Sequence, residues 1–206
     1  MKRWILGSCA TLLLCCAAGS VCAQTVIQAD QAVLQPQVGR DDIGFSTCGV
    51  RGVVVVATPD YMDSYDFSVM LRANLAYGTL KAGKLRTATQ AALKGRFASE
   101  AVTPAPIKFW IAQEGEGKPI SPIKVIPADN KGFILEVADL ADTARGIMAM
   151  IEGSRMQFAV RYKNQPVDLV VSFSAAMPEI ERAPLLKCIE GVTERLYKMA
   201  DEMPKK

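Results

Sequence analysis

Three aspartates, spaced three residues apart and interleaved with two tyrosines, are the side chains of this sequence best suited to chemistry. They lie in residues 59–66, which read PDYMDSYD. Carboxylates this close together are able to bind calcium, although the D-x-D-x-D-G spacing of the common calcium loop is absent. Glycoside hydrolysis also uses two nearby carboxylates, and a sequence does not show how far apart they lie in space, so this use stays open. The residues concerned are Asp60, Tyr61, Asp63, Tyr65 and Asp66.

The tyrosines of this segment indicate a different use. Tyrosine is enriched at the centres of protein interfaces, so the segment is also suited to contacting a macromolecular partner. We expect Tyr61 and Tyr65 to act as anchors within an acidic rim if such a partner exists. A plain solvated turn is the alternative, and the sequence alone leaves both open.

The chain contains no histidine. This excludes Ser-His-Asp and Cys-His catalytic arrangements and removes the commonest general base and metal ligand. The glycine-rich motifs that bind nucleotide phosphates are also absent. Ser121 and Lys124 match the S-x-x-K spacing in letters, but Pro122 disfavours the helix on which that motif depends, so we expect a strand and turn there. The sequence therefore predicts no enzyme, no metal and no cofactor.

Four of the six cysteines lie within the first 22 residues, in a segment typical of a signal peptide. Two basic residues precede an apolar stretch, residues 4–18, that is shorter than the roughly 20 residues needed to span a bilayer. Small residues follow, and Val21-x-Ala23 fits the small-x-small rule for cleavage. We expect cleavage after Ala23, so that the early cysteines leave with residues 1–23.

Two other fates of this segment stay open. A lipid anchor would modify Cys15 or Cys22, although the residues before them fit the required pattern poorly. An uncleaved membrane anchor is the other alternative. A short signal without a second apolar span favours a periplasmic or secreted bacterial protein with no stable membrane insertion.

Two cysteines remain after cleavage, Cys48 and Cys188. Export into an oxidising compartment favours a disulfide between them, because the mature chain offers no other partner. Two free buried thiols are the alternative. Loss of Lys2 and Arg3 lowers the formal net charge from +3 to +1, so net charge gives no reason to expect nucleic acid or a membrane surface as a partner.

Charge is nevertheless uneven along the chain. Residues 67–99 contain six basic side chains and no acidic one. If these side chains share one face, they would attract an anionic envelope component or an acidic protein. Scattering over several solvated faces is the alternative. The six are Arg72, Lys81, Lys84, Arg86, Lys94 and Arg96.

The pattern of apolar residues divides the mature chain into a polar N-terminal arm, residues 24–44, and one globular domain, residues 45–206. The arm is expected to be loosely attached or to form an edge strand. The valine run at residues 53–56 predicts a central strand covered on both faces. Alternation over residues 65–72 predicts a half-buried strand. Further strands are expected at 75–86, 107–113, 120–126 and 132–137, with a turn at 114–117.

Capping residues predict three helices. The first covers residues 87–94, whose first four residues have the capping-box spacing. Asp139 caps the second, and Gly153 ends it. Pro184 suits the first position of the last helix, on which Cys188 faces the core.

Between the second and third helices, residues 155–162 and 167–173 alternate on either side of a turn and predict a β-hairpin. Few of the helices are placed to connect parallel strands. The fold class is therefore α+β: a mainly antiparallel β-sheet, arranged as a sandwich or partial barrel, with two or three covering helices.

Residues 144–188 combine a helix ending in IMAMIEG, a strand MQFAVRY, a second strand and a helix that bears Cys188. This pattern resembles the ending of small exported bacterial proteins of the invasion-associated locus B type. The resemblance implies a β-sandwich without a known catalytic site. It does not extend over residues 45–137, and it assigns no functional residue.

Taken together, these features favour a non-catalytic exported protein that binds a macromolecular partner, a protein or an envelope polymer, in the bacterial envelope. Two alternatives remain open. An immunity or inhibitor protein would bind one toxin or envelope enzyme tightly through an exposed loop such as residues 60–66. A carboxylate-dependent hydrolase would act on envelope polymers instead.

Overall fold

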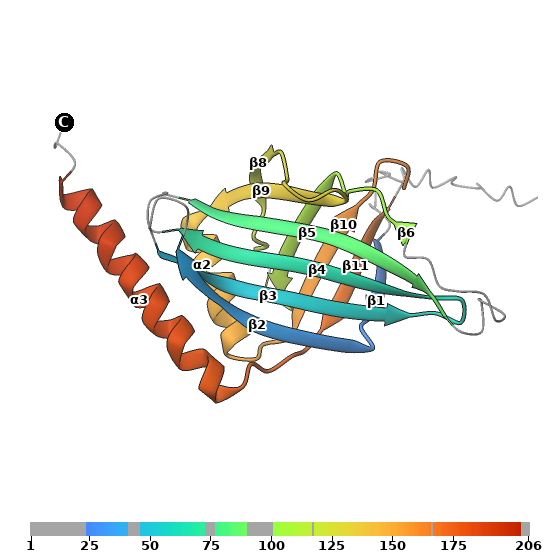
Figure 1. The fold of residues 1–206 in the computed structure, drawn as a ribbon, viewed down its shortest axis with the longest axis horizontal. Coiled ribbons are helices and arrows are strands. Elements are labelled where there is room, and N and C mark those ends of the chain that lie inside the picture. Colours follow the sequence, from blue (N-terminus) through green and yellow to red (C-terminus); the bar gives the residue numbers. More distant parts are fainter. Residues whose placement is uncertain are drawn as a thin grey trace, which may run out of the picture.

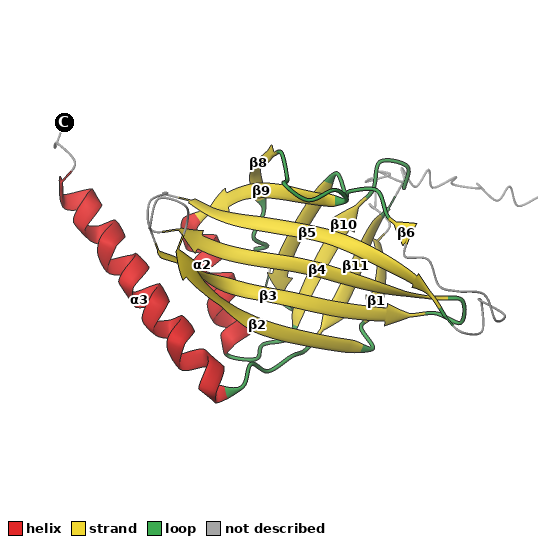
Figure 2. Cartoon of the chain, in the orientation of Figure 1, coloured by secondary structure: helices red, strands yellow, loops and turns green. Residues whose placement is uncertain are grey.

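The computed structural model describes residues 24–40, 46–72, 77–89, 101–116, 118–165 and 167–202. Within these residues the chain forms two packed β-sheets and two helices (Figure 1). The sheets are mainly antiparallel and do not close into a barrel (Figure 2). The predicted α+β class, with the sheets arranged as a sandwich, is confirmed.

The larger sheet contains seven strands of the described chain, in the order β2-β3-β4-β5-β9-β8, with the short β6 added beside β5. All its neighbouring strands are antiparallel. The strands are β2 (Gln31–Arg40), β3 (Ser46–Ala57), β4 (Tyr61–Arg72), β5 (Tyr77–Ala88), β6 (Ala101–Val102), β8 (Pro122–Ile126) and β9 (Phe133–Asp139).

The smaller sheet has the order β1-β11-β10-β7 within the described residues. The predicted hairpin at its centre is confirmed, because β10 and β11 pair antiparallel from Met156 opposite Phe173 onward. β1 pairs with β11 in the parallel direction. The strands are β1 (Gln24–Gln28), β7 (Lys108–Gln113), β10 (Met156–Arg161) and β11 (Asp168–Phe173).

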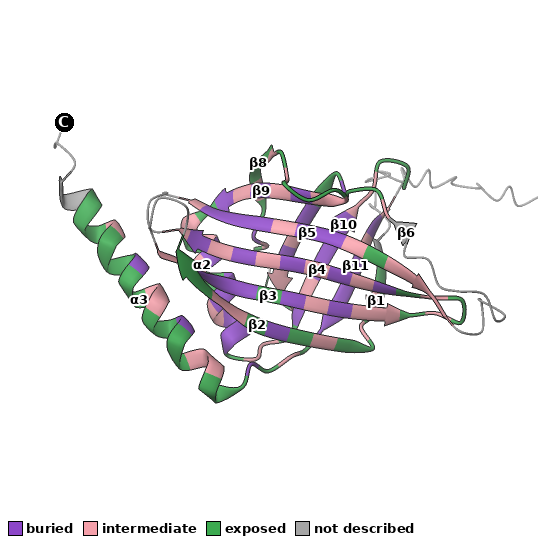
Figure 3. Cartoon of the chain, viewed as in Figure 1, coloured by how far each residue is buried: buried purple, intermediate pink, exposed green. Residues whose placement is uncertain are grey.

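β4 shows how the alternating sequence positions the core. Its odd-numbered residues from Asp63 to Leu71 are buried on the inner face, which is turned toward the smaller sheet and the helices. Its even-numbered residues from Ser64 to Arg72 are half-buried on the outer face. Figure 3 shows buried and half-buried residues mixed along the neighbouring long strands as well, with the period of two most regular on β4.

Five aromatic rings from both sheets form the centre of the core. The centroids of neighbouring rings lie 5.1 to 6.1 Å apart, the range in which tilted aromatic pairs attract each other. Gly52 on β3 gives one of them room, since a Cβ atom there would lie 2.1 Å from Cζ of Phe67. The rings belong to Tyr65, Phe67, Phe109, Phe158 and Phe173.

Two helices cover the rest of the inner face. α2 (Leu140–Ile151) packs against β4 and β5, and α3 (Glu179–Glu202) packs against β2 and β3. Asp139 caps α2 as predicted, because its Oδ1 accepts a hydrogen bond from the Asp142 N–H at 3.0 Å. Gly153, with φ of 77°, follows the end of α2.

Cys48 on β3 and Cys188 on α3 form a disulfide, with their Cα atoms 5.8 Å apart. The predicted pairing is therefore confirmed. Cys48 is fully buried, and Leu185 and Val192 of α3 are buried on either side of the bridge. The disulfide thus holds α3 against one end of the larger sheet.

The start of α3 differs from the prediction. The helix begins at Glu179, so Pro184 lies inside it rather than at its first position. Pro178 provides the start instead, because its carbonyl oxygen accepts the N–H groups of Glu181 at 3.0 Å and Arg182 at 3.2 Å. The two glutamates of the first turn also suit the positive end of the helix dipole.

The helix predicted at residues 87–94 was wrong at its start. Thr87 and Ala88 belong to β5, because strand pairing with β4 continues as far as Ala88 opposite Tyr61. The remainder of the helix predicted there, residues 90–94, lies outside the described residues. The predicted turn after β7 is present, because the Glu116 N–H donates to the Gln113 carbonyl at 3.2 Å. The strands on either side of it, β7 and β8, belong to different sheets, and an isolated bridge joins Ile111 of β7 to Ile120, which precedes β8.

Within the valine run in β3, only Val54 is fully buried. Val54 on the inner face is completely buried, whereas Val53 and Val55 on the outer face are half-buried. On the adjacent β2, Val33 is 54% exposed. The outer face of the sheet is therefore partly open to solvent here, and the prediction of a strand buried on both faces was wrong.

Residues 24–40 provide an edge strand for each sheet, β1 for the smaller and β2 for the larger. Asp30 lies between these strands, and its Oδ2 accepts a hydrogen bond from the Ala57 N–H at 2.7 Å. None of the helices in the described residues is both long enough and apolar enough to cross a membrane.

Candidate functional site

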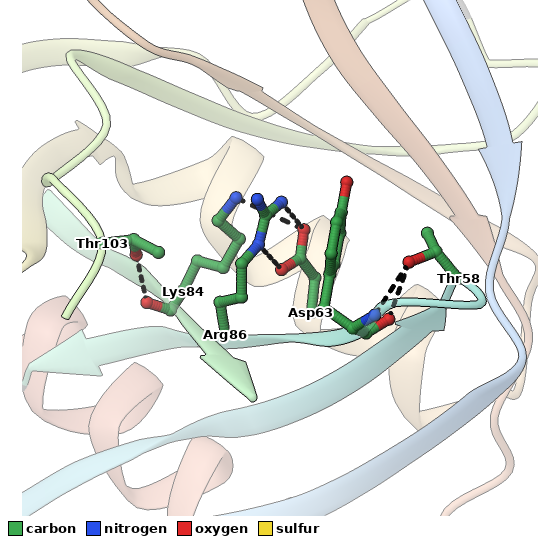
Figure 4. A network of polar contacts seen from close by, with 6 residues as sticks. Thr58, Asp63, Lys84, Arg86 and Thr103 are labelled. Atoms are coloured by element: carbon green, nitrogen blue, oxygen red, sulfur yellow. Dashed lines mark hydrogen bonds and ion pairs between the residues drawn. The ribbon is translucent and has the colours of Figure 1, made fainter. Parts of the chain in front are cut away.

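A charged cluster lies on the inner face of the larger sheet, beyond the aromatic core. It consists of Asp63 on β4 and Lys84 and Arg86 on β5 (Figure 4). The antiparallel register places Asp63 directly opposite Arg86 and Tyr65 opposite Lys84. Because alternate residues of a strand share a face, all four side chains are directed to the same side of the sheet.

Arg86 binds both oxygens of the Asp63 carboxylate. Its Nε donates to Oδ1 at 2.6 Å, and its Nη2 donates to Oδ2 at 2.7 Å. Lys84 Nζ lies 3.3 Å from Oδ2. Asp63 is only 6% exposed, so the carboxylate of this bidentate pair is shielded from water and its geometry is well defined. The hydrogen bond to Asp63 raises the pKa of Arg86, which therefore stays charged.

Aromatic rings enclose the two cations. The Arg86 guanidinium stacks on Tyr61 with its Cζ 3.7 Å from the ring centroid. Lys84 Nζ lies 5.1 Å from the ring centroid of Tyr162, which follows β10, and 5.8 Å from that of Tyr65. These distances suit cation–π attraction. Burial nevertheless lowers the pKa of Lys84, because it outweighs the opposing effect of Asp63.

Two polar groups of this cluster are incompletely paired within the described part of the chain. The Tyr162 hydroxyl oxygen is buried and has no hydrogen-bond partner there. Lys84 Nζ has one hydrogen bond, the 3.3 Å contact with Asp63, although an ammonium group can donate three. Burial raises the pKa of the Tyr162 hydroxyl, so this group remains a neutral donor at physiological pH.

The β3–β4 turn, residues 58–60, is fixed to the end of β5 beside the cluster. Thr58 Oγ1 donates to the Tyr61 carbonyl at 2.9 Å, and the Tyr61 N–H donates to Thr58 Oγ1 at 3.1 Å. Thr89 N–H donates to the Asp60 carbonyl at 2.9 Å. Thr103 Oγ1 donates to the Lys84 carbonyl. Tyr61 and Arg86 are therefore presented by a well-connected backbone.

The five residues singled out by sequence do not form one loop. Asp60 is exposed in the turn, whereas β4 already begins at Tyr61, which is half-buried. Asp63 and Tyr65 are buried on the inner face. Asp66 lies on the outer face, where its carboxylate pairs with Arg51 at 3.0 and 2.5 Å. The fold thus brings Tyr61, Asp63 and Tyr65 together and separates them from Asp66.

This geometry is unfavourable to the metal and hydrolase alternatives. Asp63 and Asp66 face opposite sides of the sheet, so the three aspartates cannot converge on one ion, and these two cannot flank one glycosidic bond. Among the described residues, no group of three or more Asp, Glu or Cys is placed to hold a metal ion. Ser121 precedes strand β8, and Lys124 lies within it, as the sequence predicted.

The basic residues of segment 67–99 do not form one face where the structure describes them. Lys84 and Arg86 lie on the inner face with Asp63. Lys81 lies on the outer face, where its Nζ donates to Asp129 Oδ1 at 2.6 Å. Arg72 ends β4 on the outer face, at the opposite end of the strand from Asp63. The remaining two, Lys94 and Arg96, lie outside the described residues.

Sequence reasoning missed Lys84, Arg86 and Tyr162 as partners of Asp63. Lys84 and Arg86 belong to a segment already noted for its charge, but only the β4–β5 register places them beside Asp63. Tyr162 comes from the other sheet. A second surface feature was also missed: an apolar groove of about 360 Å³ between α2 and α3, lined in part by Leu71, Leu140, Val192 and Leu196.

Comparisons with protein-family models, with curated proteins and with solved structures found no match for this chain. The function must therefore be argued from the chemistry of the chain itself.

Proposed function

We propose that this chain is a non-catalytic exported protein that binds a macromolecular partner in the bacterial envelope. The proposed contact surface is the end of the sandwich formed by the β3–β4 turn, Tyr61 and the exposed edge of Arg86. The observation that carries this proposal is the double restraint on Arg86, which is paired in a bidentate manner with Asp63 and stacked on Tyr61.

Preorganised side chains favour binding because they lose little conformational freedom when a partner arrives. Tyrosine and arginine are also the residue types that dominate interface energetics. Arg86 keeps 37% of its side chain exposed, and Asp60, which precedes Tyr61, is exposed as well. The surface therefore presents a rigid ring and a planar cation, with a carboxylate at its rim.

The same contacts make this cluster a poor catalytic centre. Both oxygens of Asp63 are engaged by Arg86, so the carboxylate is not available to accept a proton from a substrate. A binding function thus accounts for the arrangement better than a hydrolase does.

The proposed export rests on the N-terminal sequence pattern and is supported by the disulfide. Cys48 and Cys188 are bridged, and disulfides persist mainly in oxidising compartments such as the periplasm.

Affinity capture from a periplasmic extract tests the proposal. The wild-type protein should retain a specific partner, and Tyr61→Ala should weaken retention by roughly 2 kcal/mol in free energy, or about thirtyfold. Tyr197→Ala is the matched control, because Tyr197 is 70% exposed on α3 at the other end of the molecule. Equal loss in both variants, or turnover of peptidoglycan by the purified wild-type protein, would contradict the proposal.

A further inference from the structure

The charged cluster contains more hydrogen-bond donors than its single carboxylate can accept. Arg86 occupies both oxygens of Asp63 at 2.6 and 2.7 Å, which leaves Lys84 with a long contact of 3.3 Å. The Tyr162 hydroxyl has no acceptor among the described residues. Buried donors without acceptors destabilise a fold, so the presence of two in one cluster favours an acceptor other than the described residues.

The charge of the cluster indicates the nature of that acceptor. Lys84 and Arg86 contribute two positive charges, and Asp63 contributes one negative charge. The neighbouring side chains of Tyr61, Tyr65 and Tyr162 are neutral and add no charge to the cluster. A net charge of one is therefore left in a site largely withdrawn from water, where a compensating anion is favoured.

We propose that Lys84 Nζ and Tyr162 Oη bind one carboxylate group, delivered along the edge of the sandwich past Arg86. A carboxylate carries the single negative charge that the cluster lacks, and it offers two oxygens to the two donors. The dianion of a phosphate monoester would overcompensate the charge. Arg86 is 37% exposed and Lys84 is 10% exposed, which places Arg86 on the solvent side of the cluster.

This inference deepens the proposed function. One source of the ligand, a carboxylate of the macromolecular partner, rests on that proposed function. A free organic acid has the same chemistry and is the other source. Sodium acetate serves as the probe for both, because it carries the carboxylate without further recognition groups.

The test is an acetate titration of the purified protein, with its disulfide intact, at constant ionic strength maintained with sodium chloride. The backbone amide NMR signals of residues 83–86 on β5 should move and saturate with acetate. Lys84→Met should weaken acetate binding by at least about tenfold. Tyr162→Phe should weaken it by about fivefold, and it should fold normally because the oxygen that it removes has no partner in the described chain.

Lys81→Met is the matched control, since Lys81 lies on the same strand but on the outer face, paired with Asp129. Acetate binding should be unchanged in this variant. The inference is overturned if the β5 signals do not saturate, if methyl phosphate binds as well as acetate, or if Lys84→Met and Lys81→Met behave alike.

Competition distinguishes the two sources. If acetate releases the captured partner, the partner supplies the carboxylate; if acetate binds without releasing it, the ligand is a free organic acid. Should capture depend on Tyr61 while acetate fails to bind, the carboxylate site is wrong and the proposed function stands. If acetate binds while no partner is captured, the carboxylate site stands and the proposed function is wrong.

Discussion

The two ends of the sandwich are closed in different ways. At one end α3 covers the larger sheet through apolar side chains such as Leu185 and Val192, and the Cys48–Cys188 disulfide fixes it there. At the other end Asp63, Lys84 and Arg86 hold each other among tyrosine rings. The first end is secured by a covalent bond and hydrophobic burial, and the second by compensation of buried charge.

Under the proposed function, this difference assigns stability to the α3 end and recognition to the charged end. Apolar packing is tolerant of small shifts and non-directional, so the α3 end can stabilise the fold without presenting specific chemistry. A buried ionic cluster contributes little net stability relative to apolar packing but fixes side chains in one geometry. The comparison therefore predicts a large loss of stability when the α3 end is altered, and effects on both stability and binding at the charged end.

Removal of the disulfide should have the largest effect on stability. The bridge joins residues 140 positions apart, and in the chain-entropy model such a loop stabilises the fold by up to about 5 kcal/mol. Cys188→Ser, or reduction of the wild-type protein, should lower the melting temperature markedly in thermal denaturation followed by circular dichroism. Reductant should not lower it further in Cys188→Ser. An unchanged wild-type melting temperature under reductant would mean that apolar packing alone holds α3.

Loss of the Asp63 charge should have the next largest effect. Asp63→Asn leaves Lys84 and Arg86 without a counter-ion in a mostly buried site, which should lower the free energy of unfolding by about 3 to 4 kcal/mol. Urea denaturation measures this change. Asp66→Asn is the control on the same strand: its partner Arg51 is 44% exposed, so the loss there should stay below about 1 kcal/mol. Equal losses of unfolding free energy would show that burial does not strengthen the ionic interactions of the inner cluster.

A third carboxylate lies between these two ends, and no cation among the described residues is in contact with it. Glu136 on β9 is fully buried, and its Oε1 accepts the Phe109 N–H at 3.3 Å, across the two sheets. Its Oε2 has no partner in the described part of the chain. Burial raises its pKa from 4.5 to about 7, although the nearby charge of Lys108 and the Phe109 hydrogen bond oppose this.

Glu136 should therefore make the protein less stable as pH rises. The folded state holds its proton more tightly than the unfolded state, so this stability is fully present below pH 4.5 and is lost as pH rises through about 7. The loss amounts to about 3 kcal/mol at most. Urea denaturation at pH 5, 6, 7 and 8 should show this decline in the wild type and a flatter profile in Glu136→Gln. Glu116→Gln, at an exposed position, should keep the wild-type slope.

Local sequence patterns predicted much of the fold. The cap at Asp139 and the glycine at 153 bounded α2, because both act through hydrogen bonds or backbone conformation within one turn. Alternation located the inner face of β4 correctly. The start of α3 was misplaced because Pro178 and Pro184 both suit a helix N-terminus, and sequence alone does not rank them.

The sequence revealed only part of the candidate site. Tyr61, Asp63 and Tyr65 stood out by type and spacing, but their partners Lys84 and Arg86 are brought to them by strand pairing. A shift of one residue in that register would have directed both cations to the outer face, because side chains alternate along a strand. The register depends on the total burial of both strands, which a short motif does not contain.

The sequence by itself determined the elements whose causes are local: the alternating strands, the capped helix α2, the β10–β11 hairpin and the pair of cysteines left for one bridge. Only the tertiary structure decided what lies beside Asp63. Arg86 is 23 residues away along the chain, and Tyr162 comes from the opposite sheet. Side-chain direction repeats every two residues of a strand, whereas register and sheet packing arise from contacts between distant segments, so chemistry assembled across two sheets emerges only when the whole core has formed.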